Sequence, residues 1–325
     1  MRFKAWLGLV GLLLISTLTA CANGGGGAAA SPQNEPSVSA APQTPAATGG
    51  VTLRIGSKNF TEQFILAEMY AQALEANGFQ VDRENIGLAN EAIAHQAITN
   101  GEIDLYPEYV ATALQAILKQ ELPRPPDRDE IYRRVKDAYA QQFKLAVLEP
   151  SGFENNQALA MTKPRAGELG ITTYSDLAQQ AGQLVLGGPP EFFERPDGLR
   201  GLQQAYGGFN FREVRQLTPS LRYPALQDGT VDVVVAFTTD GEIAGLDLQL
   251  LQDDKQFYPP YQVAPVVRQA VLDANPQLAA ILNRVTAELK DPQTMAALNW
   301  QVDGPEGKEP AEVARAFLQQ RGIVQ

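Results

Sequence analysis

The sequence predicts an α/β protein of two lobes with a ligand cleft between them. Two stretches far apart in the chain share one pattern, in which a glycine is followed by a Val/Ile-Asp pair, a short apolar strand and an aromatic residue. They run from Gly101 to Thr112 and from Asp228 to Phe237. Because ligands of open α/β sheets bind at the carboxyl ends of the strands, aromatics at two such ends predict two lobes facing one site. A chain of 325 residues is long enough for both.

The first fifty residues are expected to stand apart from the folded lobes. Arg2 and Lys4 precede an apolar run that is shorter than the roughly 20 residues of a membrane-spanning helix. This pattern predicts a signal peptide over residues 1–20. It ends in LTAC, which resembles the bacterial lipobox, so Cys21 is predicted to carry a lipid; an ordinary signal peptide followed by a chance cysteine is the alternative. Residues 21–50 are rich in Gly, Ala, Ser and Pro, which predicts a flexible tether.

The charge of the chain excludes one large class of partner. The formal net charge is −11, whereas nucleic-acid phosphates attract Lys and Arg. An acidic surface also does not adhere to anionic lipid, so contact with the membrane is expected through the lipid anchor only.

The first lobe is predicted to begin as a parallel strand–helix–strand–helix–strand unit. Asn59 followed by Glu62 resembles a capping box at the start of the first helix. Asn77 and Gly78 then form the stop signal of that helix. The elements are expected at 51–57, 60–77, 79–88, 90–101 and 103–105, followed by a helix at 129–143 and a strand at 144–148.

A second α/β set follows the first crossover, which is predicted at 150–152. Its strands are expected at 157–162, 184–187, 231–237 and 248–252, and its helices at 197–206 and 220–227. A second crossover is predicted at 258–261. The rest is interpreted as helical and is expected to cover the first sheet, at 275–290, 292–300 and 310–321. Lobe 1 is therefore predicted to comprise residues 51–149 and 256–325, and lobe 2 residues 150–255, with the two crossovers forming a hinge.

Catalytic signals are weak in this sequence. His95 is the one histidine, and it lies in a helical pattern with no nucleophile directed toward it. Neither a His/Cys metal set nor a glycine-rich phosphate loop is present. Carboxylate pairs such as Glu102/Asp104 and Asp253/Asp254 are interpreted as solvated surface. The sequence therefore predicts a protein that is not an enzyme and needs no cofactor or metal.

Aromatic residues at the predicted strand ends and crossovers are more informative. They are Tyr106, Tyr109, Phe237, Tyr258 and Tyr261, and they lie off the periodic apolar faces. Packing between lobes is the alternative role for each. Grouped around a cleft, their ring faces attract a cation by about 0.5–2 kcal/mol each when desolvated.

Four segments, in this order, resemble one protein family. They are 55–63 (IGSKNFTEQ), 101–112 (GEIDLYPEYVAT), 236–241 (AFTTDG) and 253–267 (DDKQFYPPYQVAPVV). The chain over residues 51–325 is similar to the substrate-binding proteins of osmoprotectant ABC importers, which take up glycine betaine, choline and related quaternary amines. The resemblance implies a type II periplasmic-binding fold, no catalysis, and closure of two lobes on a trimethylammonium group. It also implies a monomer that is held at the outer face of a membrane and serves an ABC permease and ATPase.

The resemblance also implies which residues contact the ligand. Tyr109 and Tyr261 fall on tyrosines of the aromatic cage, and Phe237 falls where the family usually has another tyrosine. Gln157 replaces a further tyrosine that the family often has, and Asn155 in the same segment is counted with the site. These two departures leave open an alternative ligand, a different amine or a heterocyclic betaine.

Three residues fall on positions that hold the carboxylate of the ligand in this family: Lys58, Thr112 and Arg195. An arginine can grip a carboxylate with two parallel hydrogen bonds, and a lysine adds a point charge. The alternative for Arg195 is a surface ion pair with Glu191 or Glu194. The alternative for Lys58 is a water-exposed lysine at a helix start.

The leading interpretation is thus a lipid-anchored receptor for a quaternary ammonium zwitterion, with glycine betaine expected first and choline, carnitine or proline betaine as possible ligands. A lipoprotein enzyme of unknown kind and a purely structural surface lipoprotein are the interpretations from other classes.

Overall fold

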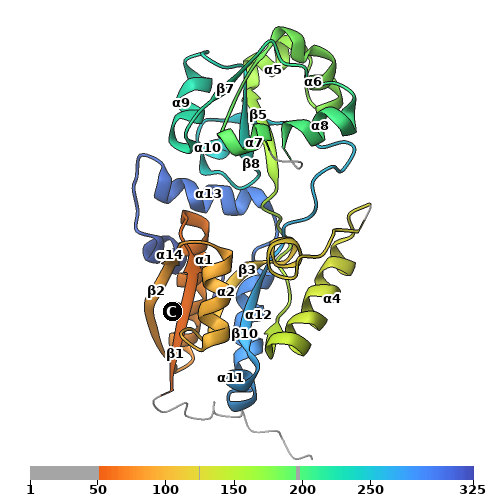
Figure 1. Cartoon of the computed structure of the whole chain (residues 1–325). Coiled ribbons are helices and arrows are strands. Elements are labelled where there is room, and N and C mark those ends of the chain that lie inside the picture. The colour runs from red at the N-terminus through yellow and green to blue at the C-terminus, as the bar shows by residue number, and fades with distance from the viewer. Residues whose placement is uncertain (1–50, 124, 195–197) are drawn as a thin grey trace, which may run out of the picture. The chain divides into compact units, whose positions relative to one another are not determined.

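The computed structural model describes residues 51–325 except 124 and 195–197, and not the side chains of 191 and 219. The predicted signal peptide, lipidated cysteine, tether and Arg195 lie outside the described residues. Two five-stranded sheets with associated helices form the described part (Figure 1). None of its helices is long and apolar enough to cross a bilayer.

The first sheet has the strand order β2-β1-β3-β10-β4. Its strands are β1 (Thr52–Lys58), β2 (Gln80–Leu88), β3 (Leu105–Tyr109), β4 (Leu145–Val147) and β10 (Val263–Arg268). β1 runs parallel to β2 and β3, whereas β10 lies antiparallel between β3 and β4. Figure 1 shows the blue β10 beside the N-terminal strand β3, which lies far from it in sequence.

Two predictions for this sheet are wrong. The chain after residue 261 is not all helical, because β10 lies between β3 and β4 in the sheet, with residues 263–267 buried. The strand expected at 103–105 is also misplaced, because β3 begins at Leu105 and continues through Pro107 to Tyr109. Pro107 lies directly opposite Pro265 of β10. Because proline has no backbone N–H to donate, the missing strand-to-strand hydrogen bonds are confined to this one pair of residues.

Helix α1 (Thr61–Ala76) fills the interior of the first lobe between the sheet and the C-terminal helices. Two rows of apolar side chains on this helix are fully buried, namely Ile65, Met69 and Ala73 in one row and Leu66, Tyr70 and Leu74 in the next. The predicted stop at Asn77 and Gly78 is confirmed, since Asn77 is the C-cap and Gly78 has a φ of 87°. The predicted capping box is wrong: Phe60 is the N-cap, with no side-chain cap, and Glu62 turns into the protein interior.

The remaining elements of this lobe lie around the sheet. α2 (Glu91–Asn100) begins with the Asn90 side chain accepting from the backbone of Ile93 and ends at Gly101 in the left-handed region, as predicted. The others are α3 (Val110–Thr112), the π-helix η1 (Ala113–Ile117), α4 (Arg128–Ala138), the π-helix η2 (Tyr139–Phe143), α11 (Gln269–Ala274), α12 (Leu278–Ala287) and α14 (Pro310–Gln320). α12 and α14 pack on α1, so these helices cover the first lobe as expected.

Asp104, interpreted above as solvated, is buried and ties three parts of the first sheet together. Its carboxylate accepts from Arg54 Nη2 of β1 at 2.8 Å and from Arg268 Nη1 of β10 at 3.2 Å. Burial alone would raise the pKa of Asp104, but the hydrogen bonds from Arg54 and Arg268 lower it below its ordinary value.

The second sheet has the order β7-β6-β8-β5-β9. Its strands are β5 (Gln157–Thr162), β6 (Val185–Gly188), β7 (Glu213–Gln216), β8 (Val233–Phe237) and β9 (Leu248–Leu250). Its helices are α5 (Lys163–Leu169), α6 (Tyr174–Gln180), the 3-10 helix η3 (Ala181–Gln183), α7 (Pro190–Glu194), α8 (Leu199–Tyr206), the 3-10 helix η4 (Pro219–Leu221), α9 (Arg222–Gln227) and α10 (Gly241–Gly245). The sequence interpretation missed β7, α5 and α6 but placed β5 correctly.

Helix α13 (Pro292–Asp303) contacts both lobes, which was not expected. It packs against α1 and also against α10 of the second lobe. The approach to α10 is so close that a Cβ atom added at Gly245 would lie 2.0 Å from the Trp300 ring. Only a residue without a side chain fits there. The exact lobe boundaries at 149/150 and 255/256 stay a prediction.

Candidate functional site

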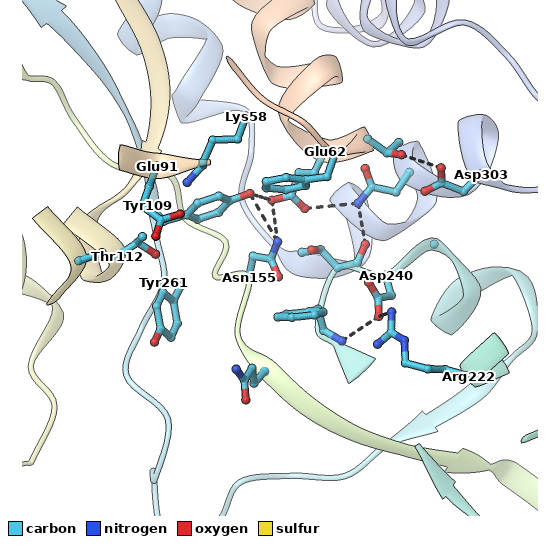
Figure 2. Close-up of a pocket in the computed structure, with 18 of the residues that line it drawn as sticks. Lys58, Glu62, Glu91, Tyr109, Thr112, Asn155, Arg222, Asp240, Tyr261 and Asp303 are labelled. Carbon is cyan, nitrogen blue, oxygen red and sulfur yellow. Dashed lines mark hydrogen bonds and ion pairs between the residues drawn. The ribbon is translucent and has the colours of Figure 1, made fainter. Parts of the chain in front are cut away.

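A cavity of about 700 Å³ is lined by residues of both sheets and of α13 (Figure 2). Its volume falls within the range of about 300–1,000 Å³ that is usual for small-molecule sites. Of the predicted site residues, seven line it: Lys58, Tyr109, Thr112, Asn155, Gln157, Phe237 and Tyr261. The eighth, Arg195, lies outside the described residues.

Four aromatic rings contribute to the wall of this cavity. Tyr109 comes from the end of β3 and stacks on Phe60, with ring centroids 6.2 Å apart and planes inclined by 19°. Phe237 comes from the end of β8 and remains 37% exposed, and Tyr261 comes from the second crossover. Phe60 was not among the predicted site residues, because its side chain precedes a helix and resembles a helix-start packing residue.

Two of the five aromatics that were grouped around the cleft are not part of it. Tyr106 is fully buried beneath β3 in a core shared with α2 and η2. Tyr258 belongs to the core of the second lobe, where its ring meets Tyr174. Tyr106 points to the opposite face of β3 from Leu105 because strand side chains alternate. Each of these two rings therefore packs within the core of one lobe and not in the cavity or between the lobes.

Glu62 lies at the back of the aromatic wall and joins several elements. The Tyr109 hydroxyl donates to its Oε1 in a short hydrogen bond, and Asn155 Nδ2 donates to the same oxygen at 3.1 Å. Asn299 Nδ2 of α13 donates to Oε2 at 3.3 Å and to the Thr239 carbonyl at 2.7 Å. Glu62 is 2% exposed, and this burial raises the pKa of its carboxyl group while the hydrogen bonds oppose the shift.

Lys58 is enclosed in the protein. The alternative interpretation of Lys58 as a water-exposed lysine at a helix start is therefore wrong. Its side chain at the end of β1 is 7% exposed, and Nζ lies 2.7 Å from Glu108 Oε1. The same carboxylate accepts from the Tyr109 backbone N–H at 2.6 Å and from the Tyr106 hydroxyl at 3.2 Å. Lys58 Nζ also lies 4.5 Å from the centroid of the Tyr109 ring. Its charge is therefore already matched by a buried carboxylate.

The side of the cavity built by the second sheet is organised differently. Gln157 of β5 and Phe237 of β8 are directly opposite each other in an antiparallel pair, so their side chains share one face. The Gln157 Oε1 atom is buried and has no hydrogen-bond partner among the residues that the structure describes. Asn155 Oδ1 and Asn299 Oδ1 of the Glu62 network are also buried with no hydrogen-bond partner among the described residues. The exposure of Phe237 is therefore what distinguishes this part of the wall from the Glu62 network.

Arg222 is a cavity residue that the sequence interpretation missed. Its Nη1 donates to the Val235 carbonyl at 2.6 Å, and its Nη2 lies 3.5 Å from Asp240 Oδ2. Asp240 also accepts from the backbone N–H of Phe237 at 2.8 Å, which fixes the turn after β8. In sequence Arg222 begins a short helix, where nothing distinguishes it from a surface arginine.

Tyr261 is held from both ends. Its hydroxyl donates to Gln115 Oε1 at 3.2 Å, and its backbone N–H donates to Asn156 Oδ1 at 3.0 Å. Thr112 lies on the same side, in α3, directly after the Tyr109 strand end. Asn156 therefore supports the ring from the first crossover, whereas its neighbours Asn155 and Gln157 face the cavity.

The charges of the described lining favour a cation. Four lining residues are acidic (Glu62, Glu91, Asp240 and Asp303) and two are basic (Lys58 and Arg222). Burial raises the pKa of Asp303, whose carboxylate accepts from the Thr61 hydroxyl at 2.6 Å. Within the described residues, no group of three or more His, Cys, Asp or Glu side chains is placed to hold a metal ion.

Two sheets that share a ring-lined, acidic cavity define a solute-binding protein. Residues 51–320 match the family described as the substrate-binding domain of ABC-type glycine betaine transport systems, and the chain belongs to this family. The family that the four sequence motifs predicted is thereby confirmed.

Two relatives show the range of solutes attributed to similar chains. The chain is 37% identical over 283 residues to a glycine-betaine-binding protein of Pseudomonas aeruginosa, covering 84% of this chain and 89% of the relative. It is 35% identical over 272 residues to an ergothioneine transport permease/ergothioneine binding protein of Helicobacter pylori, covering 83% of this chain. It spans about half the length of that relative, 48%.

Solved structures confirm the two-lobed type II periplasmic-binding fold. A glycine betaine/carnitine/choline ABC transporter structure has a TM-score of 0.76 at 31% identity, covering 83% of this chain and 99% of that one. The ligand-free structure of the Escherichia coli protein YehZ has a TM-score of 0.73 at 31% identity, covering 85% and 100% of the two chains.

Proposed function

We propose that this protein is an extracytoplasmic receptor that binds a quaternary ammonium zwitterion in the cavity and delivers it to an ABC permease and ATPase. The observation that carries the proposal is the combination of aromatic rings with an excess of carboxylates around one small-molecule cavity. A trimethylammonium group has no N–H to donate, so it is recognised by ring faces and by negative charge and not by hydrogen bonds.

The rings come from separate parts of the chain, which gives the ligand a role in lobe closure. Tyr109 follows a strand of the first sheet, Phe237 follows a strand of the second, and Tyr261 lies in the crossover between them. A cation that contacts rings of both lobes stabilises the closed form more than the open form. Binding then shifts the population toward the form that a permease can distinguish from the empty receptor.

The anionic end of the zwitterion is assigned to Lys58, Thr112 and Arg195. Thr112 lines the cavity with a hydroxyl that can donate to a carboxylate. Lys58 can share its remaining N–H donors between Glu108 and the ligand, although the buried ion pair reduces its net attraction. Arg195 is retained from the family pattern, and Arg222 contributes a guanidinium to the described lining.

A heterocyclic betaine is the second candidate ligand. Gln157 and Phe237 replace two tyrosines of the family cage, which widens one wall and leaves an amide there. Ergothioneine is a trimethylammonium betaine with a thione-bearing imidazole ring, and a relative of this chain is named for binding it. A ring with N–H groups could donate to the unpartnered Gln157 oxygen, which glycine betaine cannot do.

The remaining parts of the proposal concern the cell envelope. We propose that Cys21 carries a lipid, that residues 21–50 tether the binding lobes to the membrane surface, and that the protein acts as a monomer. Radiolabelled palmitate incorporation that is lost in Cys21→Ser tests the anchor; equal labelling of both proteins, or none in either, would contradict it.

Isothermal titration of the purified protein with glycine betaine, choline, carnitine, ergothioneine and glutamine tests the ligand class. We expect heat from at least one betaine and none from glutamine. Arg195→Ala should weaken a betaine by about 2 kcal/mol while changing choline much less, because choline has no carboxylate. If no quaternary ammonium solute gave binding heat, the proposed function would be contradicted. If Arg195→Ala lowered the affinities for betaine and choline equally, Arg195 would not be part of the carboxylate site.

A further inference from the structure

The buried carboxylate of Glu62 stands behind one particular ring of the cavity. The Tyr109 hydroxyl points at Glu62 Oε1, and Figure 2 shows Asn155 completing this contact from the side. Tyr109 is 5% exposed and Glu62 is 2% exposed, so the contact is shielded from water. An interaction between charges in such surroundings is stronger than one at the protein surface.

Burial raises the pKa of the Glu62 carboxyl group, and the hydrogen-bond donors around it oppose this shift by favouring the ionised form. Both of its oxygens receive hydrogen bonds, Oε1 from Tyr109 and Asn155 and Oε2 from Asn299. An ionised carboxylate accepts at every position, whereas a protonated one must also donate. Asn299 is itself oriented by its second bond, to the Thr239 carbonyl at 2.7 Å, so its N–H groups are fixed toward acceptors.

The charge of Glu62 is not cancelled by the neighbouring lysine. Lys58 Nζ lies 4.5 Å from the Tyr109 ring centroid, but it is paired with Glu108 at 2.7 Å. The Lys58–Glu108 pair is neutral as a unit. The charge that remains next to the Tyr109 ring is therefore that of Glu62.

The other rings of the cage have different surroundings. Phe237 has no hydroxyl, and the Tyr261 hydroxyl donates to the neutral amide oxygen of Gln115 at 3.2 Å. A phenol that donates to a carboxylate shifts electron density toward its ring, because hydrogen-bonded groups polarise one another. A more negative ring face attracts a cation more strongly.

We propose that Glu62 is the residue that makes this cavity select a cationic head group over a neutral head group of the same shape, acting through Tyr109. Glu62 lines the cavity, and its carboxylate is held by Tyr109, Asn155 and Asn299. Its proposed role is that of a specificity residue that acts on the cation through the Tyr109 ring. This inference rests on the proposed function and adds to it the source of charge selectivity. The alternative is that Glu62 only holds the Tyr109 ring in place.

A pair of ligands with the same shape separates the two roles. Glycine betaine and 3,3-dimethylbutanoate share their carboxylate and branched head and differ in having nitrogen or carbon at its centre. We expect Glu62→Gln to weaken glycine betaine by about 3- to 10-fold while leaving 3,3-dimethylbutanoate unchanged or tighter. A residue that only holds the ring would weaken both ligands by the same factor.

Tyr109→Phe is the matched control, since it keeps the ring and removes the bond to Glu62. It should reproduce the selective loss, and the Glu62→Gln/Tyr109→Phe double variant should lose little more than either single variant. If Glu62→Gln does not fold, Tyr109→Phe alone decides the question through the same ligand pair. Titration calorimetry for glycine betaine and competition against it for the carbon analogue give both constants.

The outcomes separate the two proposals. Equal losses of the two ligands in Glu62→Gln or Tyr109→Phe, or additive losses in the double variant, would overturn the role of Glu62 and leave the receptor function intact. A wild-type protein that binds no quaternary ammonium solute would overturn both.

Discussion

The two halves of the cavity wall are built in different ways. On the side of the first sheet, Lys58, Glu62 and Tyr109 are almost fully buried and joined to one another and to Glu108 by hydrogen bonds and an ion pair. On the side of the second sheet, Phe237 is 37% exposed beside its cross-strand neighbour Gln157. The half of the wall on the first sheet is therefore preorganised to attract a cation, and the half on the second sheet can adapt to the shape of the solute.

This division explains how one fold can serve several solutes. A preorganised ring backed by a carboxylate costs little to order on binding, so we expect it to supply affinity for any quaternary ammonium group. The wall that carries the half-exposed Phe237 is less enclosed, so we expect its side chains to decide which solute body fits behind that group. Substitutions in the first half should therefore act on stability and on all ligands, and those in the second half on ligand choice.

The largest effect is expected from Lys58→Met. The change leaves the Glu108 carboxylate buried without its cation, which should lower the free energy of unfolding by about 3–5 kcal/mol. The double variant Lys58→Met/Glu108→Gln should recover most of this loss, because it removes both charges together. Urea denaturation followed by circular dichroism measures the difference. Unchanged stability in Lys58→Met would show that the first half is not preorganised as described.

Tyr109→Leu should have the next largest effect, and on binding. It removes a ring face and the donor to Glu62, so every quaternary ammonium solute should bind about 2 kcal/mol more weakly, roughly 30-fold. Thermal melting controls for folding, and calorimetry with glycine betaine and choline gives the affinities. A loss confined to one of these ligands would contradict a general role for this wall.

Phe237→Leu should cost less, about 1 kcal/mol, because the half-exposed ring is only partly desolvated. Phe237→Tyr, which restores the family residue, is the matched control and should bind as well as the wild type. The same calorimetry applies. If Phe237→Leu lowered the binding affinity as much as Tyr109→Leu, the two halves of the cavity wall would not differ in their contribution to binding.

Gln157→Tyr should cause the smallest change in binding free energy. A fourth cage ring should strengthen glycine betaine binding by about 0.5–1 kcal/mol and weaken a bulkier heterocyclic betaine, since the ring takes up space that the amide leaves open. Competition between the two ligands on wild type and variant shows the shift in ratio directly. An unchanged ratio would mean that Gln157 does not face the bound solute.

Local sequence signals predicted much of the fold and part of the site. Tyr109, Phe237 and Tyr261 follow strand ends or a proline-rich crossover, and such signals are contained in a few neighbouring residues. The β10 strand was missed because its apolar run has no alternation and carries Pro265, which argues against a central strand. Its partners β3 and β4 lie more than a hundred residues earlier, where no local pattern can point to them.

The position of Glu62 in the site could not be predicted from the sequence. Asn59 and Glu62 have the spacing of a capping box, and the sequence offers no sign that the carboxylate turns inward. Its partners Tyr109, Asn155 and Asn299 are 47, 93 and 237 residues away. The role of such a residue depends on tertiary contacts that bring a strand end, a crossover and a C-terminal helix together.

A crystal structure of the protein with its tightest-binding betaine would show directly whether the quaternary nitrogen lies beside the Tyr109 ring. We predict that the quaternary nitrogen lies within about 6 Å of the ring centroids of Tyr109, Phe237 and Tyr261, with the solute body beside Gln157. A betaine bound elsewhere in the cavity, with its nitrogen away from Tyr109 and its Glu62 support, would contradict the account.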